Sequence, residues 1–265
     1  MSRISLSRLQ QMKQQRERIA LLTAYDASFA HILDAAGVDI LLVGDSLGMV
    51  VQGQPSTLPV SLDEMVYHTA MVCRGSQRAM VISDLPFMSY TSAEQALHSA
   101  ARLMKEGGAQ MVKLEGGAEV VEIVARLSSM GVPVCAHLGL LPQSVHKLGG
   151  YKVQGRSEVD AARILADARA LQAAGADLLV LECVPRGLAK RVTEALQIPV
   201  IGIGAGAGTD GQVLVLYDML GITPGKRPSF SQDFLQQAGS IPAAIEAYVA
   251  AVRRGDFPGP EQGFD

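Results

Sequence analysis

The stretch that decides the fold is KEGGAQMVKLEGG at residues 105–117, because it contains a unit that the rest of the chain repeats. It runs from the end of a helical segment through a glycine turn into a short apolar strand, and the strand ends in charged residues. The stretches AAGVDILLVGD at 35–45 and AAGADLLVLECVP at 173–185 have the same order. Alternation of helix and strand in such units is typical of α/β proteins with a parallel sheet.

Apolar runs of this kind recur eight times, and they are continuous rather than alternating. This indicates strands that are buried on both faces, as in parallel sheets. Eight strands alternating with helices in 265 residues favour a closed (β/α)8 TIM barrel over an open doubly wound sheet. We expect a single barrel domain over residues 1–265, with an N-terminal helix before the first strand. The runs begin at Ile19, Asp39, Ala79, Ala109, Val132, Asp177, Ile198 and Gln212.

The composition excludes several classes of protein. The net charge is −3 and Lys and Arg are scattered, so no basic stripe for nucleic acid is present. No apolar run approaches the ~20 residues of a membrane span, and the N-terminus lacks the apolar segment of a signal peptide. Cys73, Cys135 and Cys183 leave an odd thiol and no CxxC spacing, which argues against a disulfide framework. A cytoplasmic protein is the default expectation.

Two helix starts carry a capping-box pattern, in which a hydroxyl residue precedes an acidic one by three positions. Thr91 with Glu94 predicts the start of one helix, and Ser61 with Glu64 predicts another. The stretch GIGAGAGTDG from Gly202 is open to two interpretations, a phosphate cradle or a tight turn after a strand, and glycine spacing alone does not decide between them.

Most apolar runs end in a polar or ionisable residue. In a barrel these strand ends converge on one face, where the active sites of this fold lie. Asp and Ser at such positions also serve as helix caps, but capping does not explain Lys113, His137 or Glu182 equally well. The residues are Asp26, Asp45 with Ser46, Asp84, Lys113 with Glu115, His137, Glu182 and Asp218.

Three of these side chains, Asp45, Asp84 and Glu115, are carboxylates from different strands that could together hold one hard divalent cation such as Mg2+. The absence of a His/Cys cluster at zinc spacing argues against zinc. Lys113 could balance the negative charge, or could be a Schiff-base nucleophile. Surrounding carboxylates would keep its amine charged, which favours the first role. His137 could donate a hydrogen bond to a substrate oxygen or to a metal-bound water.

Long blocks of the sequence resemble the ketopantoate hydroxymethyltransferase family over nearly the whole chain. The density of these blocks excludes a chance match. They are TAYDASFA at Thr23, VGDSLGMVVQG at Val43, STLPVSLDEMVYHT at Ser56, SDLPFMSY at Ser83, VKLEGG at Val112, HLGLLPQSVHKLGGYKVQGR at His137, LECVP at Leu181, GIGAG with DGQVLV, and FPGPE at Phe257.

The resemblance implies a Mg2+-dependent transfer of a hydroxymethyl group from 5,10-methylenetetrahydrofolate to 3-methyl-2-oxobutanoate, which gives 2-dehydropantoate and tetrahydrofolate in pantothenate biosynthesis. It implies that Asp45 and Asp84 ligate Mg2+ and that Glu115 completes the metal site, directly or through water. Ser46 and Lys113, together with the metal ligand Asp84, would hold the oxo acid, and Glu182 would accept its proton. The family also implies a homodecamer. Tyr217 and Leu141 depart from the family pattern, which often has His and Thr there.

Two other hypotheses remain open on the sequence. The first is another Mg2+-dependent 2-oxo-acid enzyme of the phosphoenolpyruvate/isocitrate-lyase barrel type, against which the lack of a KKCGH-type motif counts. The second is a non-catalytic barrel that binds a metabolite. Such a protein would be expected to have lost at least one ionisable strand end, whereas all are present here.

Overall fold

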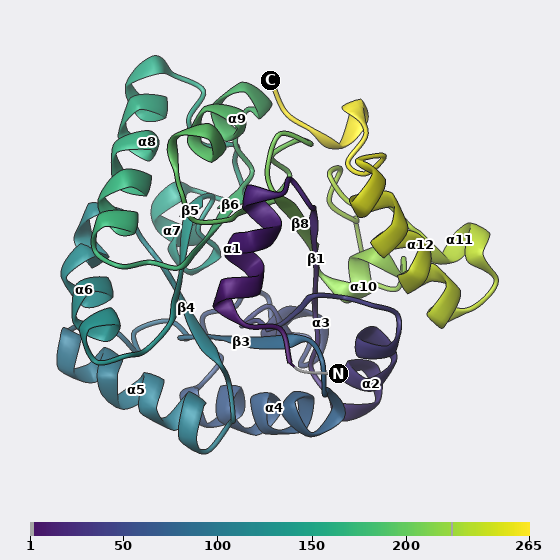
Figure 1. Cartoon of the computed structure of the whole chain (residues 1–265), viewed down its shortest axis with the longest axis horizontal. Helices are drawn as coiled ribbons and strands as arrows, with labels where there is room; N and C mark the ends of the chain where they lie inside the picture. The colour runs from purple at the N-terminus through teal and green to yellow at the C-terminus, as the bar shows by residue number, and fades with distance from the viewer. Residues whose placement is uncertain (1–2, 224) are drawn as a thin grey trace.

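The structure is a computed structural model that describes residues 3–223 and 225–265. Eight parallel strands pair in sequence order, and β1 also pairs with β8, so the sheet closes into a barrel (Figure 1). The predicted (β/α)8 fold is therefore confirmed. The strands are β1 Ile19–Thr23, β2 Ile40–Val43, β3 Met80–Asp84, β4 Met111–Glu115, β5 Val134–Gly139, β6 Leu178–Glu182, β7 Val200–Ile203 and β8 Gly211–Leu214.

Helices surround this barrel, and the main ones follow the strands in the order expected from the sequence (Figure 1). None of the helices in the described ranges combines the length and the apolar character that a bilayer span requires. The helices are α1 Leu6–Gln14, α2 Ala27–Ala35, α3 Leu47–Val50, α4 Leu62–Gly75, α5 Ala93–Lys105, α6 Val121–Ser129, α7 Val145–Leu148, α8 Glu158–Ala173, α9 Arg186–Ala195, α10 Leu216–Met219, α11 Leu235–Ala238 and α12 Ile241–Arg254, with short 3-10 turns at Ala118–Val120, Pro142–Ser144 and Pro260–Gln262.

One repeat departs from the expected pattern, because residues 204–210 join β7 to β8 as a turn without a helix. Gly204 and Gly206 adopt φ values of 58° and 75°, which favour glycine. A Cβ added to Gly211 would lie 2.3 Å from the carbonyl oxygen of Ile19, so glycine also permits β8 to approach β1. The glycine-rich stretch therefore serves as a tight turn here.

The two predicted capping boxes differ in outcome. Ser61 and Glu64 form a complete box at the start of α4, as predicted. The box predicted at Thr91 and Glu94 is wrong by one residue. Ser92 caps α5 by accepting from the N–H of Gln95, and the side chain of Gln95 accepts from the N–H of Thr91.

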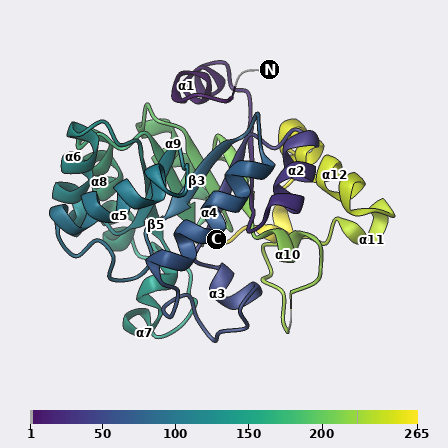
Figure 2. The same ribbon diagram turned by 90° about the horizontal axis from the view of Figure 1, so that it is seen from below.

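The predicted N-terminal helix is present as α1, and it closes one end of the barrel. It lies across the axis at the end opposite to α3 and α7 (Figures 1 and 2). Leu9 and Met12 are 1% exposed and belong to the same apolar cluster as the side chains of the barrel interior. Lys13 forms an ion pair with Asp210 at 2.6 Å, which fixes the helix to the β7–β8 turn. The amino end of the barrel is thus sealed, and ligands must enter from the carboxyl end.

This arrangement predicts that α1 is part of the folded core. Leu9→Ala should lower the free energy of unfolding by about 2–5 kcal/mol, the usual cost of deleting a buried leucine side chain. Gln10→Ala, at an exposed neighbouring position, is the matched control and should change it little. Denaturant titration followed by circular dichroism measures both. Equal stability of the two variants would contradict the role given to α1.

Candidate active site

A cavity of about 600 Å³ opens at the carboxyl ends of the strands. The register of the barrel explains which side chains meet there, because Asp84 pairs with Lys113, Glu115 with His137, and Gly139 with Glu182 on neighbouring strands. All the residues predicted for the site line this one cavity: Asp45, Ser46, Asp84, Lys113, Glu115, His137 and Glu182. Asp26 caps α2 instead, by accepting from the N–H of Phe29.

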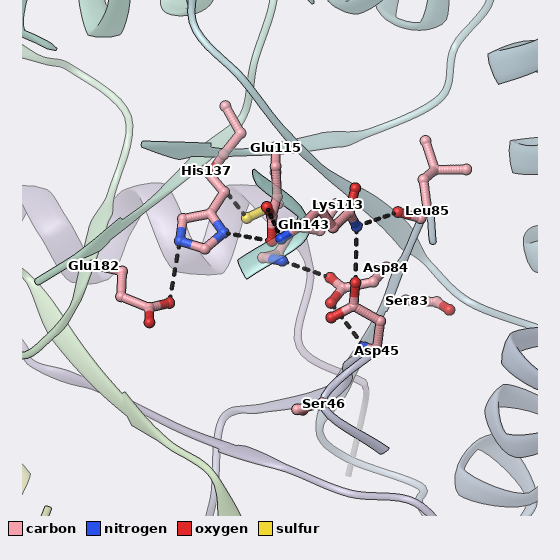
Figure 3. Close-up of polar contacts among 12 residues, drawn as sticks. Asp45, Ser46, Ser83, Asp84, Leu85, Lys113, Glu115, His137, Gln143 and Glu182 are labelled. Atoms are coloured by element: carbon pink, nitrogen blue, oxygen red, sulfur yellow. Dashed lines mark hydrogen bonds and ion pairs between the residues drawn. The ribbon is translucent and has the colours of Figure 1, made fainter. Parts of the chain in front are cut away.

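Asp45, Asp84 and Lys113 form the buried centre of the site, and each is no more than 4% exposed. The Nζ of Lys113 donates to Oδ1 of Asp84 at 2.8 Å, and the N–H of Asp45 donates to Oδ2 of Asp84 at 3.1 Å (Figure 3). Gly44 makes this approach possible, since a Cβ there would lie 2.9 Å from Oγ of Ser46 and 3.4 Å from Asp84.

The charges of this centre depend on one another. Burial raises the pKa of Asp45 well above its usual range, and the neighbouring carboxylates of Asp84 and Glu115 raise it further. Burial alone would lower the pKa of Lys113, but the surrounding carboxylates outweigh it and keep that pKa well above its ordinary value. The Lys113 amine is therefore held protonated, which argues against a Schiff-base nucleophile.

His137 lies between two carboxylates on the other side of the cavity. Its Nδ1 is 3.5 Å from Oε1 of Glu115, and its Nε2 is 3.3 Å from Oε2 of Glu182 (Figure 3). Neither contact has the geometry of a good hydrogen bond. The imidazole therefore contacts both carboxylates at the long end of hydrogen-bonding distance, and it separates Glu182 from Glu115.

Gln143, in the turn after β5, is a site residue that the sequence did not single out. Its Nε2 donates to Oδ2 of Asp45 at 2.8 Å and to the carbonyl of Leu85 at 3.0 Å, and its backbone N–H donates to Oε2 of Glu115 at 3.0 Å. The hydroxyl of Tyr90 donates to its Oε1 at 2.5 Å. Gln143 thus orients two acidic side chains at once. The only signal in the sequence was its place in the HLGLLPQS block.

Ser46 stands at the edge of the buried centre. Its hydroxyl lies 2.9 Å from the hydroxyl of Tyr25, another residue that the sequence did not indicate as part of the site. Because Ser46 lines the cavity and makes this contact through its oxygen, it can present a hydroxyl to a bound ligand.

The donor set fits a hard divalent cation. In the described ranges, no three His, Cys, Asp or Glu side chains are gathered into a ready-made metal cluster. Asp45 and Asp84, however, place buried carboxylates side by side, while the carboxylate of Glu115 is turned toward Gln143 and His137. The acidic groups outnumber the single lysine, so a cation would offset their charge. Oxygen ligands that leave positions for water or substrate suit Mg2+.

The fold and the site place this protein in the class of (β/α)8-barrel enzymes, whose reacting groups lie at the carboxyl ends of the strands. The sequence then defines the family. Residues 3–260 match the family described as ketopantoate hydroxymethyltransferase. The chain belongs to that family, and it is accordingly an enzyme, a transferase.

Relatives agree with this assignment. The chain is 64% identical over 258 residues to the 3-methyl-2-oxobutanoate hydroxymethyltransferase of Nitrosococcus oceani, covering 97% of this chain and 98% of the relative. It is 61% identical to the protein of the same name from Halorhodospira halophila, covering 99% and 95% of the two chains.

Solved structures with the same fold are more distant in sequence. One is a putative phosphonomutase from Burkholderia cenocepacia, with a TM-score of 0.63, 18% identity and coverage of 95% of this chain and 100% of that chain. Another is 2,3-dimethylmalate lyase, a member of the PEP mutase/isocitrate lyase superfamily, with a TM-score of 0.56, 20% identity and coverage of 82% and 81%. At these identities the likeness establishes the barrel fold alone.

The position of His137 leads to a prediction about pH. Burial and the charge of Lys113 oppose its protonation, but Glu115 and Glu182 outweigh them and raise the pKa of His137 to about 8. In the metal-free protein, one of the five histidines should therefore titrate near pH 8 by NMR, and this signal should be missing from His137→Gln. Titration of all five at or below pH 6.5 would contradict the electrostatics described here.

The same shift fixes the sign of a stability effect. Since the pKa of this group is higher in the folded protein than the ~6.5 of an unfolded chain, protonated His137 stabilises the fold below about pH 6.5. This contribution, about 2 kcal/mol, is lost as the pH rises through 8. The wild type should therefore lose more stability than His137→Gln between pH 6 and pH 9.

Proposed function

We propose that the protein transfers a hydroxymethyl group from 5,10-methylenetetrahydrofolate to 3-methyl-2-oxobutanoate and consumes one water, to give 2-dehydropantoate and tetrahydrofolate. Membership of the family and the names of relatives at 57–64% identity support the reaction. One structural observation carries the proposal. The carboxylate of Glu182 and the Asp45–Asp84–Lys113 centre line the same cavity and face each other across it.

In this proposal Asp45 and Asp84 hold Mg2+, and Glu115 contributes through water because its carboxylate is already turned toward Gln143 and His137. When bound, the cation supplies Lewis-acid stabilisation for the negative charge that develops on the oxo acid. One of the barrel structures similar in fold, at 11% identity and a TM-score of 0.62, is a phosphonopyruvate hydrolase in complex with oxalate and Mg++.

The residues of this chain divide the remaining work. Lys113 and Ser46 bind the oxygens of the oxo acid, and the fixed positive charge of Lys113 offsets the charge that develops. Glu182 accepts the C3 proton. The electron pair of the broken C3–H bond forms the new bond to the methylene carbon of the folate. Both bonds from this methylene carbon to N5 and N10 break, and water supplies its hydroxyl. The proton taken by Glu182 and the remaining proton of the water go to the two folate nitrogens. Either neutral or protonated, His137 can donate one N–H to a substrate oxygen or to water.

The rival hypotheses have weaker support. The fold is shared with the phosphoenolpyruvate mutase/isocitrate lyase group, but at 11–20% identity this says nothing about the reaction. A non-catalytic barrel would have no need of a carboxylate, a histidine and an ion-paired lysine converging on one cavity. The proposal also includes a single catalytic domain over residues 1–265, a homodecamer, a cytoplasmic location and a place in pantothenate biosynthesis.

The metal site can be tested by binding rather than turnover. Asp84→Asn keeps an acceptor for Lys113 but removes a charged ligand. Loss of a residue that only hydrogen-bonds to a metal ligand usually lowers metal affinity by roughly 10–100-fold. Because Asp84 is proposed as a ligand itself, the affinity of Asp84→Asn for Mg2+, measured by calorimetry, should fall by more than this. Asp177→Asn changes a half-buried aspartate at the opposite end of β6 and should bind Mg2+ like the wild type. Unchanged affinity in Asp84→Asn would refute this site.

The proton acceptor can be tested without the folate. Incubation with 3-methyl-2-oxobutanoate and Mg2+ in D2O should exchange the C3 proton, which NMR detects as collapse of the methyl doublet. Glu182→Gln keeps the shape but cannot accept a proton, so exchange should fall by about 10²–10⁴-fold. Glu194→Gln, at an exposed glutamate, is the matched control.

Slow exchange of the abstracted proton with solvent would mask the effect of Glu182, so the assay is repeated with tetrahydrofolate in the rest of the cavity, which changes the access of solvent to Glu182. If Glu182→Gln exchanges as fast as the wild type under both conditions, the base lies elsewhere. His137, whose Nε2 is 3.3 Å from Glu182, would then be the leading candidate.

A further inference from the structure

The cavity contains a buried carboxylate that the proposed mechanism does not use. Asp218 lies in α10, just after β8, is 6% exposed and lines the same cavity as the acidic centre. The hydroxyl of Thr223 donates to its Oδ1 at 2.6 Å. Within residues 3–223 and 225–265, no other side chain or backbone group donates to this carboxylate. An ionised carboxylate only accepts hydrogen bonds, and most of the acceptor sites of Asp218 are not used by the described part of the protein. Because it faces a cavity, it suits a ligand that carries N–H donors.

The wall beside Asp218 is apolar and partly aromatic. Phe230 and Phe264 both pack over Gly204 at the end of β7, where an added Cβ would lie 3.0 Å and 3.1 Å from the two rings. Both rings are partly exposed and line the cavity, together with Ile203, Val213 and Val215. This half of the cavity therefore offers flat apolar surfaces with a single anionic group, which suits a planar heteroaromatic ring.

We propose that Asp218 binds the pyrimidine edge of the pterin of the folate co-substrate, accepting hydrogen bonds from N3–H and the 2-amino group, with the ring against Phe230 and Phe264. These two N–H groups are adjacent and point the same way, so one carboxylate can accept from both, in the paired geometry that makes charge-assisted bonds strong. The assignment rests on the proposed function, which supplies the folate.

The arrangement of the cavity sets the orientation of that ring. Tyr217, next to Asp218, packs against Tyr25 with ring centroids 5.8 Å apart, and the Tyr25 hydroxyl contacts Ser46 at 2.9 Å. Asp218 is therefore connected to the oxo-acid site through two rings that are not part of the cavity lining, while Asp218 and Ser46 themselves both line the cavity. N5, which carries the one-carbon unit, lies on the edge of the pterin away from the pyrimidine donors. A pterin anchored at Asp218 thus directs N5 toward the acidic centre.

The charges around Asp218 are consistent with an anion that accepts hydrogen bonds. Burial raises the pKa of Asp218, while the hydroxyl of Thr223 and the positive charge of Arg227 oppose this. Arg227 itself pairs with Asp233 at 3.5 Å, and Lys226 lines the cavity. Donation by N3–H and the 2-amino group would further favour the ionised form.

The test is a titration of the Mg2+-loaded enzyme with tetrahydrofolate and with its 2-desamino analogue, by anaerobic calorimetry. Asp218→Asn keeps the shape and the Thr223 contact, but its amide cannot accept from both donors. It should bind tetrahydrofolate roughly 10–100-fold more weakly, which is the loss of affinity expected when hydrogen bonds to a charged group are removed. The wild type should also discriminate against the analogue, and Asp218→Asn should not. Asp177→Asn, outside the cavity, should behave as the wild type in both titrations.

Two outcomes would overturn the assignment: wild-type affinity of Asp218→Asn for tetrahydrofolate, or equal discrimination against the analogue in both proteins. A purely structural role through Thr223 predicts that Thr223→Val weakens binding as much as Asp218→Asn, which would also refute it. Failure of the wild type to convert 3-methyl-2-oxobutanoate and 5,10-methylenetetrahydrofolate would overturn the proposed function, whereas the binding titrations need no turnover and decide the Asp218 assignment independently.

Discussion

The buried ion pair between Lys113 and Asp84 is the interaction on which the rest of the site depends. Taking charges out of water costs several kcal/mol per ion, and only close pairing with further hydrogen bonds offsets this. The two residues are register partners on β3 and β4, so the fold itself brings them to 2.8 Å. The charge of Lys113 also lowers the energy of ionised Asp45, which burial, Asp84 and Glu115 otherwise raise. Without this lysine, the pKa of Asp45 would be raised further still.

The barrel builds the site through the alternation of side chains along each strand. On β4, Met111, Lys113 and Glu115 share the inner face, because residues two apart in a strand point the same way. Met111 belongs to the apolar interior cluster, and the two residues that follow on this face line the cavity. On β6, Val180 lies in the interior cluster and Glu182 follows it at the mouth. The interior thus changes from apolar near α1 to charged at the carboxyl end. The side chains that stabilise the barrel therefore lie deeper along its axis than those that line the cavity.

Much of this was predictable from the sequence, because continuous apolar runs mark parallel strands and a barrel forces their ends to converge. That reasoning located every acidic residue of the site as well as Lys113 and His137. It could not identify Gln143 and Tyr90, which lie in loops whose course depends on the folded barrel. It also expected a helix in every repeat, whereas glycines at 204 and 206 allow β7 to turn directly into β8.

The cavity is divided into two halves of different polarity, and the division follows the order of the strands. The ends of β2 to β6 contribute most of the charged groups, while the segments after β7 and β8 contribute apolar walls, the carboxylate of Asp218 and the amine of Lys226. The proposed reaction joins a small anion to a large planar donor, and water would protonate the carbanion if the donor were not already in place. A donor bound in the apolar half would lie next to the acid–base groups, so the new carbon–carbon bond can form before water protonates the carbanion. Without the donor, water reaches the carbanion instead, and the C3 proton then exchanges with solvent.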